Sequence, residues 1–501
     1  MEGEADAERP GRRGETFDGA SLPPRLARST SRPITNALSA HMATLLWLLR
    51  VLRELLRSVV HSVLQLRRTR KSPPCSDAAL NCPVVLLPGN MGDAAATARQ
   101  LQACGICAID AELGPVSSCH DRACELFYAL VGGRIDYGAR HSAEHGHARY
   151  GRLCKARHPE WSAARPVLLL CHSQGASTAL TLLQLLTDGH FHACSRHATS
   201  ALWVRGVCTV ASPLSGVSWV HSLPYAGVPP PLTPSLTPQR CVPAACEGGE
   251  DDDWDGQPHH AQSVGVGVVG WVIVVGYVLH VLLSRVVWIT EHVWDWRLEH
   301  WRLGFADVLP LVAWRHRLLH TTDTALYGLT PAGAHALAGR VQASVYYVSI
   351  TCRVTVVPNS QDSQGAATAR SCPLPRGAVA RPWHVAFAAT GAATARRACC
   401  RHSDGLVPTC AQAHPPMQPC ARLACLSPPP VSSPEAHAAQ RAVLVEALQP
   451  GVWCTPTEPW ALDHSASQLA VDSDALAFAL AVVLPAMCEA AAPLRPANFQ
   501  F

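Results

Sequence analysis

The chain reads Leu168-Leu169-Leu170-Cys171-His172-Ser173-Gln174-Gly175, and this stretch decides the fold. The leucines are typical of a buried strand, and the residues from Ala176 to Leu186 are typical of a helix. A strand, a tight turn and a helix in this order can present a serine hydroxyl at a strained turn. We therefore interpret Ser173 as a candidate nucleophile, with Cys171 standing where such turns usually carry Gly. A buried serine that only caps the helix is the alternative that this pattern leaves open.

A second apolar run precedes this stretch and ends in a turn. Residues Val84 to Leu87 are all apolar, and Pro88-Gly89-Asn90-Met91-Gly92 follows them. Continuous apolar runs bounded by turns are typical of a parallel sheet that is covered on both faces. Alternation of such runs with helical stretches predicts an α/β fold. We place the folded domain at residues 82–494, interrupted by three Pro- or Ala-rich surface loops at 224–262, 358–399 and 414–433.

Composition bounds the possible functions. The 501 residues have room for one large α/β domain with extensions or for two ordinary domains. The formal net charge is only +4, and Lys71 and Lys155 are the only lysines, so nucleic acid is not an expected partner. The 21 cysteines follow no zinc-ribbon spacing, which leaves the redox compartment open.

The N-terminal region divides into two segments. Residues 1–41 lack apolar periodicity, which predicts a disordered or targeting segment. Residues 42–71 predict an amphipathic helix whose charged side chains cluster on one side; they are Arg50, Arg53, Glu54 and Arg57. Such a helix can lie in a membrane interface or pack on its own domain, and the sequence leaves both open. A cleaved signal peptide is not favoured, because no uninterrupted apolar region precedes a cleavage site.

A serine nucleophile needs a histidine base and a carboxylate that orients it, in the chain order Ser, acid, His for this kind of fold. Asp404 precedes Gly405 in a short turn, and His464 follows Asp463 near the C-terminus. Both positions suit loops at strand ends. Taken singly, Asp404 is more typical of an ordinary turn residue and His464 of an ordinary polar loop or core residue.

Several further motifs resemble one family. The sequence is similar to the bacterial triacylglycerol lipases of the thermophilic Bacillus and staphylococcal type, within the α/β-hydrolase superfamily. The resemblance implies an α/β-hydrolase fold with a central, mostly parallel sheet, helices on both faces and a helical lid insertion. It also implies hydrolysis of acylglycerol esters, with Ser173 as nucleophile, His464 as general base and acid, and Asp404 as the orienting carboxylate. The residues that carry it lie at Gly114–Ser118, His120–Phe127, Leu130–Gly138, His141, His145–Gly151, Cys171–Gly175, Ala211–Gly216, Asp323–Leu329, Val341–Ser344, Tyr346–Ser349, Asp404–Gly405, Gly451–Trp453 and Asp463–His464.

The resemblance also implies an oxyanion hole and a metal site. The oxyanion donors are the backbone amides of Asn90 and Gln174, although Pro88-Gly89-Asn90 replaces the family's usual His-Gly-aromatic. A structural zinc ion is expected, because two imidazoles and two carboxylates suit this cation. Its implied ligands are Asp121, His141, His147 and Glu299, the last standing where the family has Asp. No calcium site is expected, since Ala466 occupies the position of an acidic calcium ligand.

An apolar segment at Val264–Leu283 is long enough to span a bilayer. A single span there would separate Ser173 from Asp404 and His464, and a triad cannot assemble across a membrane. We therefore expect a lid helix within 264–296 that acts at a membrane or lipid-droplet surface, with a true span paired with the helix at 42–71 as the alternative. A secreted or membrane-associated location is favoured over a soluble cytoplasmic one.

Two classes of function follow from these observations. The first is a serine ester hydrolase that acts on lipid esters. The second is a membrane-attached binding or scaffolding protein that keeps an inactive hydrolase fold, with Cys171 and Pro88 marking lost activity. Replacement of Ser173 distinguishes the two classes.

Overall fold

The computed structural model describes residues 80–490, apart from 91, 93, 193–197, 218–219, 221–273, 284–294, 339–340, 354, 357–369, 372–401, 430–432, 465–468 and 470–472. The chain divides into two compact units, Met1–Arg68 and Thr69–Phe501, and the first unit lies wholly outside the described residues. The predictions for 1–41, 42–71 and 224–262 therefore fall outside the described part. Of 358–399, only the two residues of strand β9 are described.

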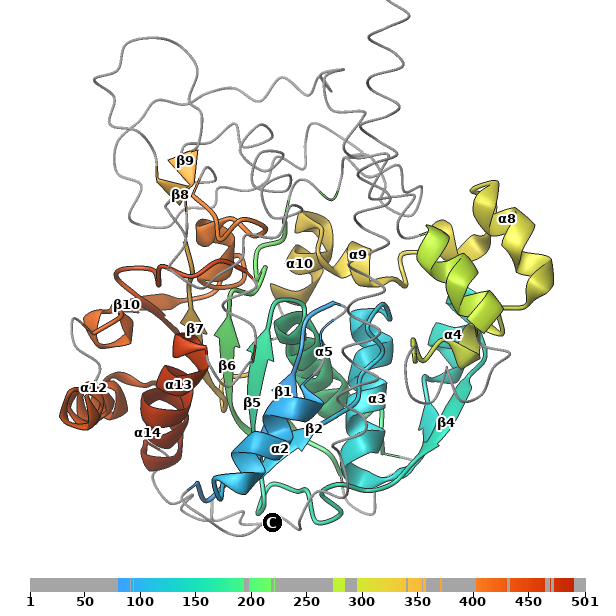
Figure 1. The fold of residues 1–501 in the computed structure, drawn as a ribbon. Helices are drawn as coiled ribbons and strands as arrows, with labels where there is room; N and C mark the ends of the chain where they lie inside the picture. The colour runs from blue at the N-terminus through green and yellow to red at the C-terminus, as the bar shows by residue number, and fades with distance from the viewer. Residues whose placement is uncertain are drawn as a thin grey trace, which may run out of the picture. The chain divides into compact units, whose positions relative to one another are not determined.

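A seven-stranded sheet forms the centre of the second unit (Figure 1). The strand order is β10-β11-β7-β6-β5-β1-β2, and every neighbouring pair is parallel, which confirms the predicted α/β fold with a parallel sheet. The strands are β1 Val84–Leu87, β2 Ala108–Asp110, β5 Val167–His172, β6 Val204–Val210, β7 Tyr346–Ile350, β10 Cys420–Leu423 and β11 Trp453–Pro456.

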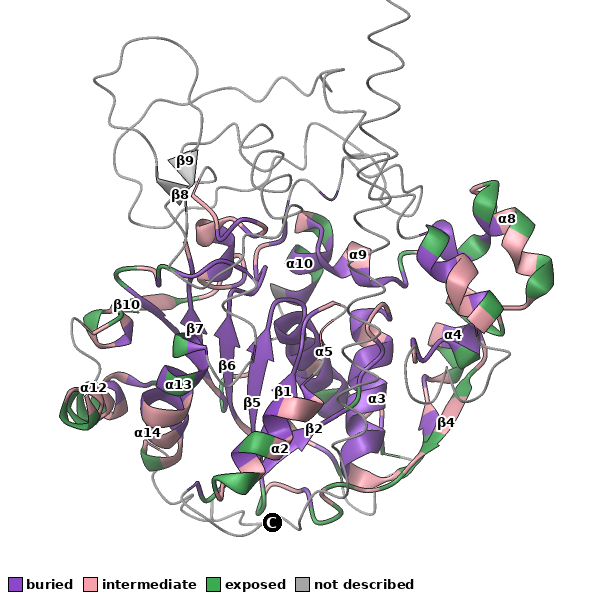
Figure 2. Cartoon of the chain, viewed as in Figure 1, coloured by how far each residue is buried: buried purple, intermediate pink, exposed green. Residues whose placement is uncertain are grey.

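Helices cover both faces of this sheet, and alternate residues of each strand face opposite sides. Val85 and Leu87 of β1 belong to a core shared with α3 (Cys119–Val131) and α5 (Gly175–Thr187). Val84 and Leu86 belong to a second core with α2 (Ala95–Ala103), α12 (Pro434–Ala447), α13 (Asp474–Phe478), the π-helix η10 (Ala479–Val483) and α14 (Leu484–Glu489). The strands are buried throughout the middle of the sheet, so its loop ends alone are available for chemistry (Figure 2).

A smaller substructure flanks α3. The antiparallel hairpin of β3 (Gly133–Asp136) and β4 (Tyr150–Cys154) encloses the short helix α4 (Ala139–His145). The backbone amide of Ala148 donates to the carbonyl of His300 at 2.8 Å, which joins this hairpin to the segment after residue 295. That segment contains η4 Glu299–Trp301, η5 Phe305–Asp307, α8 Val308–Val312, η6 Arg317–Leu319, α9 Ala325–Gly328 and α10 Pro331–Ala338. This segment therefore places residues after 295 beside the hairpin of β3 and β4.

One segment predicted as a surface loop contributes to the sheet instead. Within 414–433 lie β10, which pairs in parallel with β11, and the 3-10 turn η9 (Ala424–Leu426). The apolar pattern did not reveal β10, because this strand lies at the edge of the sheet and its side chains are only partly buried or exposed, without regular alternation.

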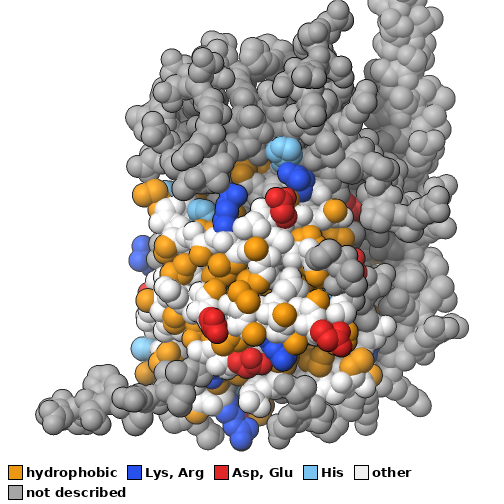
Figure 3. All heavy atoms as spheres, turned by 90° about the vertical axis from the view of Figure 1, so that its left-hand side faces the viewer, with side chains coloured by type: hydrophobic (Ala, Val, Ile, Leu, Met, Phe, Trp, Pro, Cys, Tyr) orange, Lys and Arg blue, Asp and Glu red, His pale blue; other side chains and the backbone are white. Residues whose placement is uncertain are grey.

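On the side of α12 and β10, hydrophobic side chains are interspersed with few charged ones (Figure 3).

The remaining elements are short. They are η1 Ala201–Trp203, η8 Thr409–Gln412 and the antiparallel pair β8 Thr355–Val356 and β9 Arg370–Ser371. Of the expected lid, residues 274–283 are helical, and Tyr277 and His280 contact the ring of Trp296. Across the described residues, helices are too short or too polar for a membrane crossing.

Candidate active site and metal centre

Ser173 occupies a strained turn between β5 and α5. Its φ is +52°, in the left-handed region that non-glycine residues rarely adopt. Glycine is required at 175, because a Cβ there would lie 2.1 Å from the carbonyl oxygen of Leu87. The side chain of Cys171, in the position usually held by Gly, is fully buried in the core beside α3 and α5. The fold therefore accommodates this departure, and the turn presents the serine at the carboxyl edge of the sheet.

The structure brings Ser173, His464 and Asp404 together. Oγ of Ser173 lies 3.1 Å from Nε2 of His464, and Nδ1 of the same ring lies 2.8 Å from Oδ2 of Asp404. The other carboxylate oxygen of Asp404 accepts from the backbone amides of Leu406 and Val407 at 2.9 and 2.7 Å. The aspartate is fully buried, so these bonds fix its orientation. With the proton of His464 on Nδ1, its Nε2 can accept the proton of Ser173.

His172 is a second histidine at this site, and the sequence reasoning did not assign it a role. Its Nε2 lies 3.1 Å from the carbonyl oxygen of His464, and the two ring centroids are 4.7 Å apart. Burial, with a smaller contribution from His464, holds the pKa of His172 well below its usual range, so the ring is neutral and its N–H can donate to that carbonyl. The signal available in the sequence was its position directly before Ser173.

The predicted oxyanion donors lie at the same edge. Gln174 follows Ser173 at the start of α5, and Asn90 follows β1 in the loop whose Gly89 packs against Ser173. A Cβ on Gly89 would lie 2.6 Å from the Cβ of Ser173, so this loop approaches the nucleophile closely. Among the described residues, no hydrogen bond occupies the amide of Asn90 or of Gln174.

Arg122 binds this loop through a hydrogen bond to its backbone. Its guanidinium is fully buried and donates to the carbonyl of Pro88, directly before Gly89. It also donates to the carbonyl of Gly114 and to Oγ1 of Thr178, each at 3.0 Å. These bonds connect α3, the loop after β1 and α5. Since Pro88 takes part through its backbone carbonyl, its unusual side chain does not weaken this connection.

Four metal-ligating side chains converge near α3. Nε2 of His141 lies 3.3 Å from Oδ1 of Asp121 and 3.2 Å from Oδ1 of Asp323, and Nε2 of His147 lies 3.2 Å from Oδ2 of Asp323. A tetrahedral zinc ion with bonds of about 2.0–2.2 Å separates its N and O ligands by roughly 3.4 Å. None of these nitrogens, nor Oδ1 of Asp121 or Oδ2 of Asp323, has a hydrogen-bond partner in the described structure. The four residues therefore fit a metal ion.

Neighbouring groups orient these ligands and favour the protonation states that bind a metal. Nδ1 of His147 lies 3.0 Å from the carbonyl oxygen of Ala148, which directs the lone pair of Nε2 toward the cluster. Nε2 of His300 lies 3.0 Å from Oδ2 of Asp121. Burial alone would raise the pKa of Asp121, but His300 and His141 outweigh it and hold that pKa well below its usual range. The carboxylate is therefore ionised, as a metal ligand must be.

The fourth member of the cluster is Asp323, which corrects the expectation for Glu299. The carboxylate of Glu299 forms an ion pair with Arg152, and its side chain is about half exposed. Its neighbour His300 points inward instead, to Asp121. Sequence reasoning had identified Asp323 only as the first residue of a matching motif, because its approach to His141 and His147 depends on how the chain returns after residue 295.

Known proteins resemble the chain over part of its length. Residues 78–200 match the model of the family described as Lipase-like, C-terminal domain. Lipase 1 of Staphylococcus aureus is 39% identical over 92 residues, which are 18% of this chain and 14% of that protein. The lipase of Staphylococcus epidermidis is 37% identical over 99 residues, or 20% of this chain and 14% of the relative. The sequence matches thus span about a seventh of these relatives.

Solved structures extend the comparison to most of the chain. The Staphylococcus hyicus lipase superposes with a TM-score of 0.56 at 17% identity, covering 83% of this chain and 98% of that one. EstA from Clostridium botulinum superposes with a TM-score of 0.54 at 21% identity, covering 84% and 90%. At these identities the structures establish the fold, and the matched segment establishes the relationship. The chain is thus related to the staphylococcal lipases, its residues 78–200 match the lipase-like family model, and it has the α/β fold of bacterial lipases.

Proposed function

We propose that the chain is a lipase that hydrolyses acylglycerol esters through a Ser-His-Asp triad and an acyl-enzyme intermediate. The observation that carries the proposal is the continuous relay from Ser173 Oγ to His464 Nε2 and from His464 Nδ1 to Asp404, at 3.1 and 2.8 Å. The positive φ of Ser173 supports it, because a serine that merely caps a helix has no need of that strain.

The reaction follows from this geometry. Oγ of Ser173 attacks the ester carbonyl while its proton moves to Nε2 of His464, and Asp404 stabilises the resulting imidazolium. The tetrahedral intermediate then breaks its bond to the alcohol, which leaves with the proton from His464. Water repeats the sequence on the acyl-enzyme, with His464 again as base, and releases the fatty acid and free Ser173.

We assign the stabilisation of the developing oxyanion to the backbone amides of Asn90 and Gln174. Preorganised donors of this kind typically contribute about 10²–10³ in rate each. Arg122 contributes by holding the carbonyl of Pro88, two residues before Asn90. We regard it as a positioning residue, because it contacts the loop and not the reacting atoms.

Zinc is the metal proposed for Asp121, His141, His147 and Asp323. A closed tetrahedron of four protein ligands is typical of a structural ion, which crosslinks the elements that supply the ligands. The ligands come from α3, from α4 and the turn after it, and from the segment before α9. The ion would therefore join the hairpin substructure to the central core.

The proposed site of action is a lipid surface, reached from a secreted or membrane-associated location. The helical residues 274–283 support this role, because Val275 and Leu282 are exposed while Val274 and Val281 are buried. A helix that is apolar on both its inner and outer sides suits a lid that contacts lipid when it opens. The lid motion and the lipid surface are both part of the proposal.

The experiment compares the purified full-length chain with two serine variants on emulsified triacylglycerol. Ser173→Ala should reduce kcat by several orders of magnitude, as loss of a triad nucleophile does. Ser177→Ala is the matched control, a buried serine one turn further along α5. An organophosphonate should label the wild type once, and Ser173→Ala not at all. Equal hydrolysis by Ser173→Ala, or no hydrolysis of any acyl ester by the wild type, would refute the proposal.

A further inference from the structure

A second group of metal-ligating side chains lies beside the first. His120 and Cys124 are four residues apart on α3 and therefore share one face of the helix. His190 comes from the turn after α5. Sγ of Cys124 lies 3.6 Å from Nε2 of His120 and 3.8 Å from Nε2 of His190. Ligand atoms of all three residues lie within 4.8 Å of one another.

These distances suit coordination better than ordinary packing. Zinc binds thiolate at about 2.3 Å and imidazole at about 2.0–2.1 Å, so a tetrahedral ion separates S from N by roughly 3.6 Å. Both measured separations, 3.6 and 3.8 Å, are close to this value. The three ligand atoms are thus spaced for a cation, which His120 can bind once its Nε2 has released the carbonyl of Tyr137.

Metal binding requires an unprotonated ring nitrogen on each histidine and a deprotonated thiol. Nε2 is the ring nitrogen of His190 that lies beside Sγ of Cys124, at 3.8 Å. Nε2 of His120 lies 2.9 Å from the carbonyl oxygen of Tyr137, to which it donates in the metal-free chain. Binding of a cation moves the His120 proton to Nδ1 through solvent and releases the thiol proton of Cys124. The charge of the site therefore rises by one unit on binding a divalent ion.

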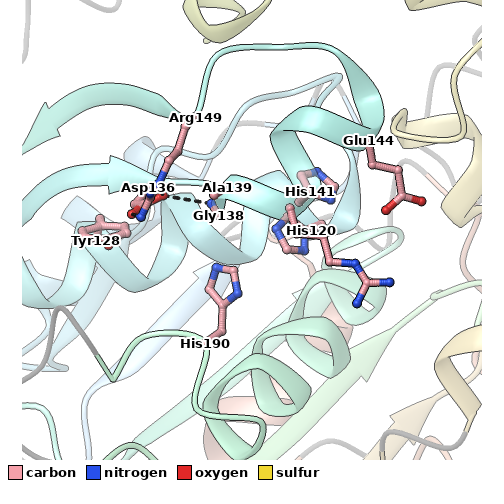
Figure 4. A pocket seen from close by; sticks show the side chains of 10 residues that line it. His120, Tyr128, Asp136, Gly138, Ala139, His141, Glu144, Arg149 and His190 are labelled. Carbon is pink, nitrogen blue, oxygen red and sulfur yellow. Dashed lines mark hydrogen bonds and ion pairs between the residues drawn. The ribbon is translucent and has the colours of Figure 1, made fainter.

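A polar pocket gives access to this group (Figure 4). It has a volume of about 590 Å³ and is lined by both histidines, His120 and His190. Figure 4 shows the ring of His120 beside that of His141, with His190 on a separate loop. The pocket is also lined by two carboxylates and two guanidinium groups, those of Asp136, Glu144, Arg140 and Arg149, and Asp136 is paired with Arg149. Water in the pocket can complete the coordination of an ion held by three protein ligands.

We propose that His120, Cys124 and His190 form a second metal site, distinct from the cluster around Asp121, that binds a thiophilic divalent cation such as Zn²⁺ or Co²⁺. The two sites are adjacent because the rings of His120 and His141 stack with centroids 3.6 Å apart. They differ in chemistry, since the first offers only nitrogen and oxygen and the second offers a thiolate. This inference does not depend on the proposed lipase activity.

Co²⁺ distinguishes the two sites without an activity assay. Thiolate ligation of Co²⁺ produces an intense charge-transfer absorption in the near ultraviolet, which nitrogen and oxygen ligands do not produce. The full-length, metal-free chain is titrated with Co²⁺ under reducing conditions, and bound metal is counted by elemental analysis after gel filtration. We expect two ions per chain, one of them accompanied by the charge-transfer band.

Variants assign each ion to its site. Cys124→Ala and His190→Asn should each bind one ion and lose the band or most of its intensity, whereas Asp323→Asn should lose one ion and keep the band. Cys208→Ala is the matched control, because Cys208 is also fully buried in the core. A single ion per wild-type chain, or an undiminished band in Cys124→Ala, would overturn the proposal. Circular dichroism of each variant verifies that it has folded, and His190→Asn provides the test if Cys124→Ala has not.

Discussion

Replacing Gly89 by alanine should impair the proposed reaction far more than it impairs folding. The new Cβ would lie 2.6 Å from the Cβ of Ser173 and 3.2 Å from its Oγ, whereas carbon atoms in contact prefer about 3.5–4.0 Å. The loop after β1 must therefore retreat by about 1 Å. A displacement of this size at a reacting centre typically costs about 10²-fold in rate. Because this loop carries the amide of Asn90, we expect kcat to fall by about that factor.

The assay separates rate from stability. kcat and KM are measured on a soluble p-nitrophenyl ester, and the free energy of unfolding is measured by urea titration. Overpacking typically costs about 1–3 kcal/mol, so the variant should remain folded. Gly304→Ala is the control, since the nearest atom to its added Cβ lies 3.9 Å away. An unchanged kcat in a folded Gly89→Ala protein would refute the assignment of this loop to the oxyanion hole.

Three further predictions concern the metal cluster and the buried arginine. Asp323→Asn should lose one equivalent of bound zinc in elemental analysis, and Glu299→Gln should retain it, because Glu299 pairs with Arg152. In the metal-free chain, burial alone would lower the pKa of His141, but the aspartates beside it raise that pKa to about 9. Protonation of His141 therefore increases the free energy of unfolding. This contribution is fully present below about pH 6.5 and is lost as the pH rises through 9. Urea titrations in the presence of EDTA at several pH values should detect the loss. Arg122→Met should lower the free energy of unfolding by several kcal/mol, because two buried carbonyls lose their donor at about 1–3 kcal/mol each. In the same variant kcat should decrease, and unchanged kinetics would contradict a positioning role for Arg122.

The parts of the molecule that sequence predicted best are those specified locally. The apolar run before Ser173, the small residue at 175 and the helix after it all lie within one short segment. The alternation of buried strands and helices likewise follows from neighbouring residues, and it gave the correct fold class. Asp404 and His464 were found through motifs that resemble a family, and the contacts of His464 with both Ser173 and Asp404 are consistent with that expectation.

The parts that sequence missed depend on contacts between distant segments. Glu299 and Asp323 both lie in the region that returns to α3, and nothing in their local patterns indicates which one turns inward. Glu299 remains at the surface because Arg152 on β4 is there to pair with it. Strand β10 was missed for a related reason, since its place beside β11 is set by the sheet and not by its own apolar content.

One turn of α3 has consequences for both proposed centres. Asp121 belongs to the metal cluster, and Arg122, the next residue, holds the loop that approaches Ser173. Successive side chains of a helix point about 100° apart, so Asp121 and Arg122 extend from the same turn of α3 in different directions. A rotation of α3 would therefore displace both side chains together, the metal-cluster ligand Asp121 and the guanidinium that binds the carbonyl of Pro88. If the proposed ion and the proposed hydrolysis both hold, removal of the ion should therefore lower the rate of ester cleavage without touching any substrate contact.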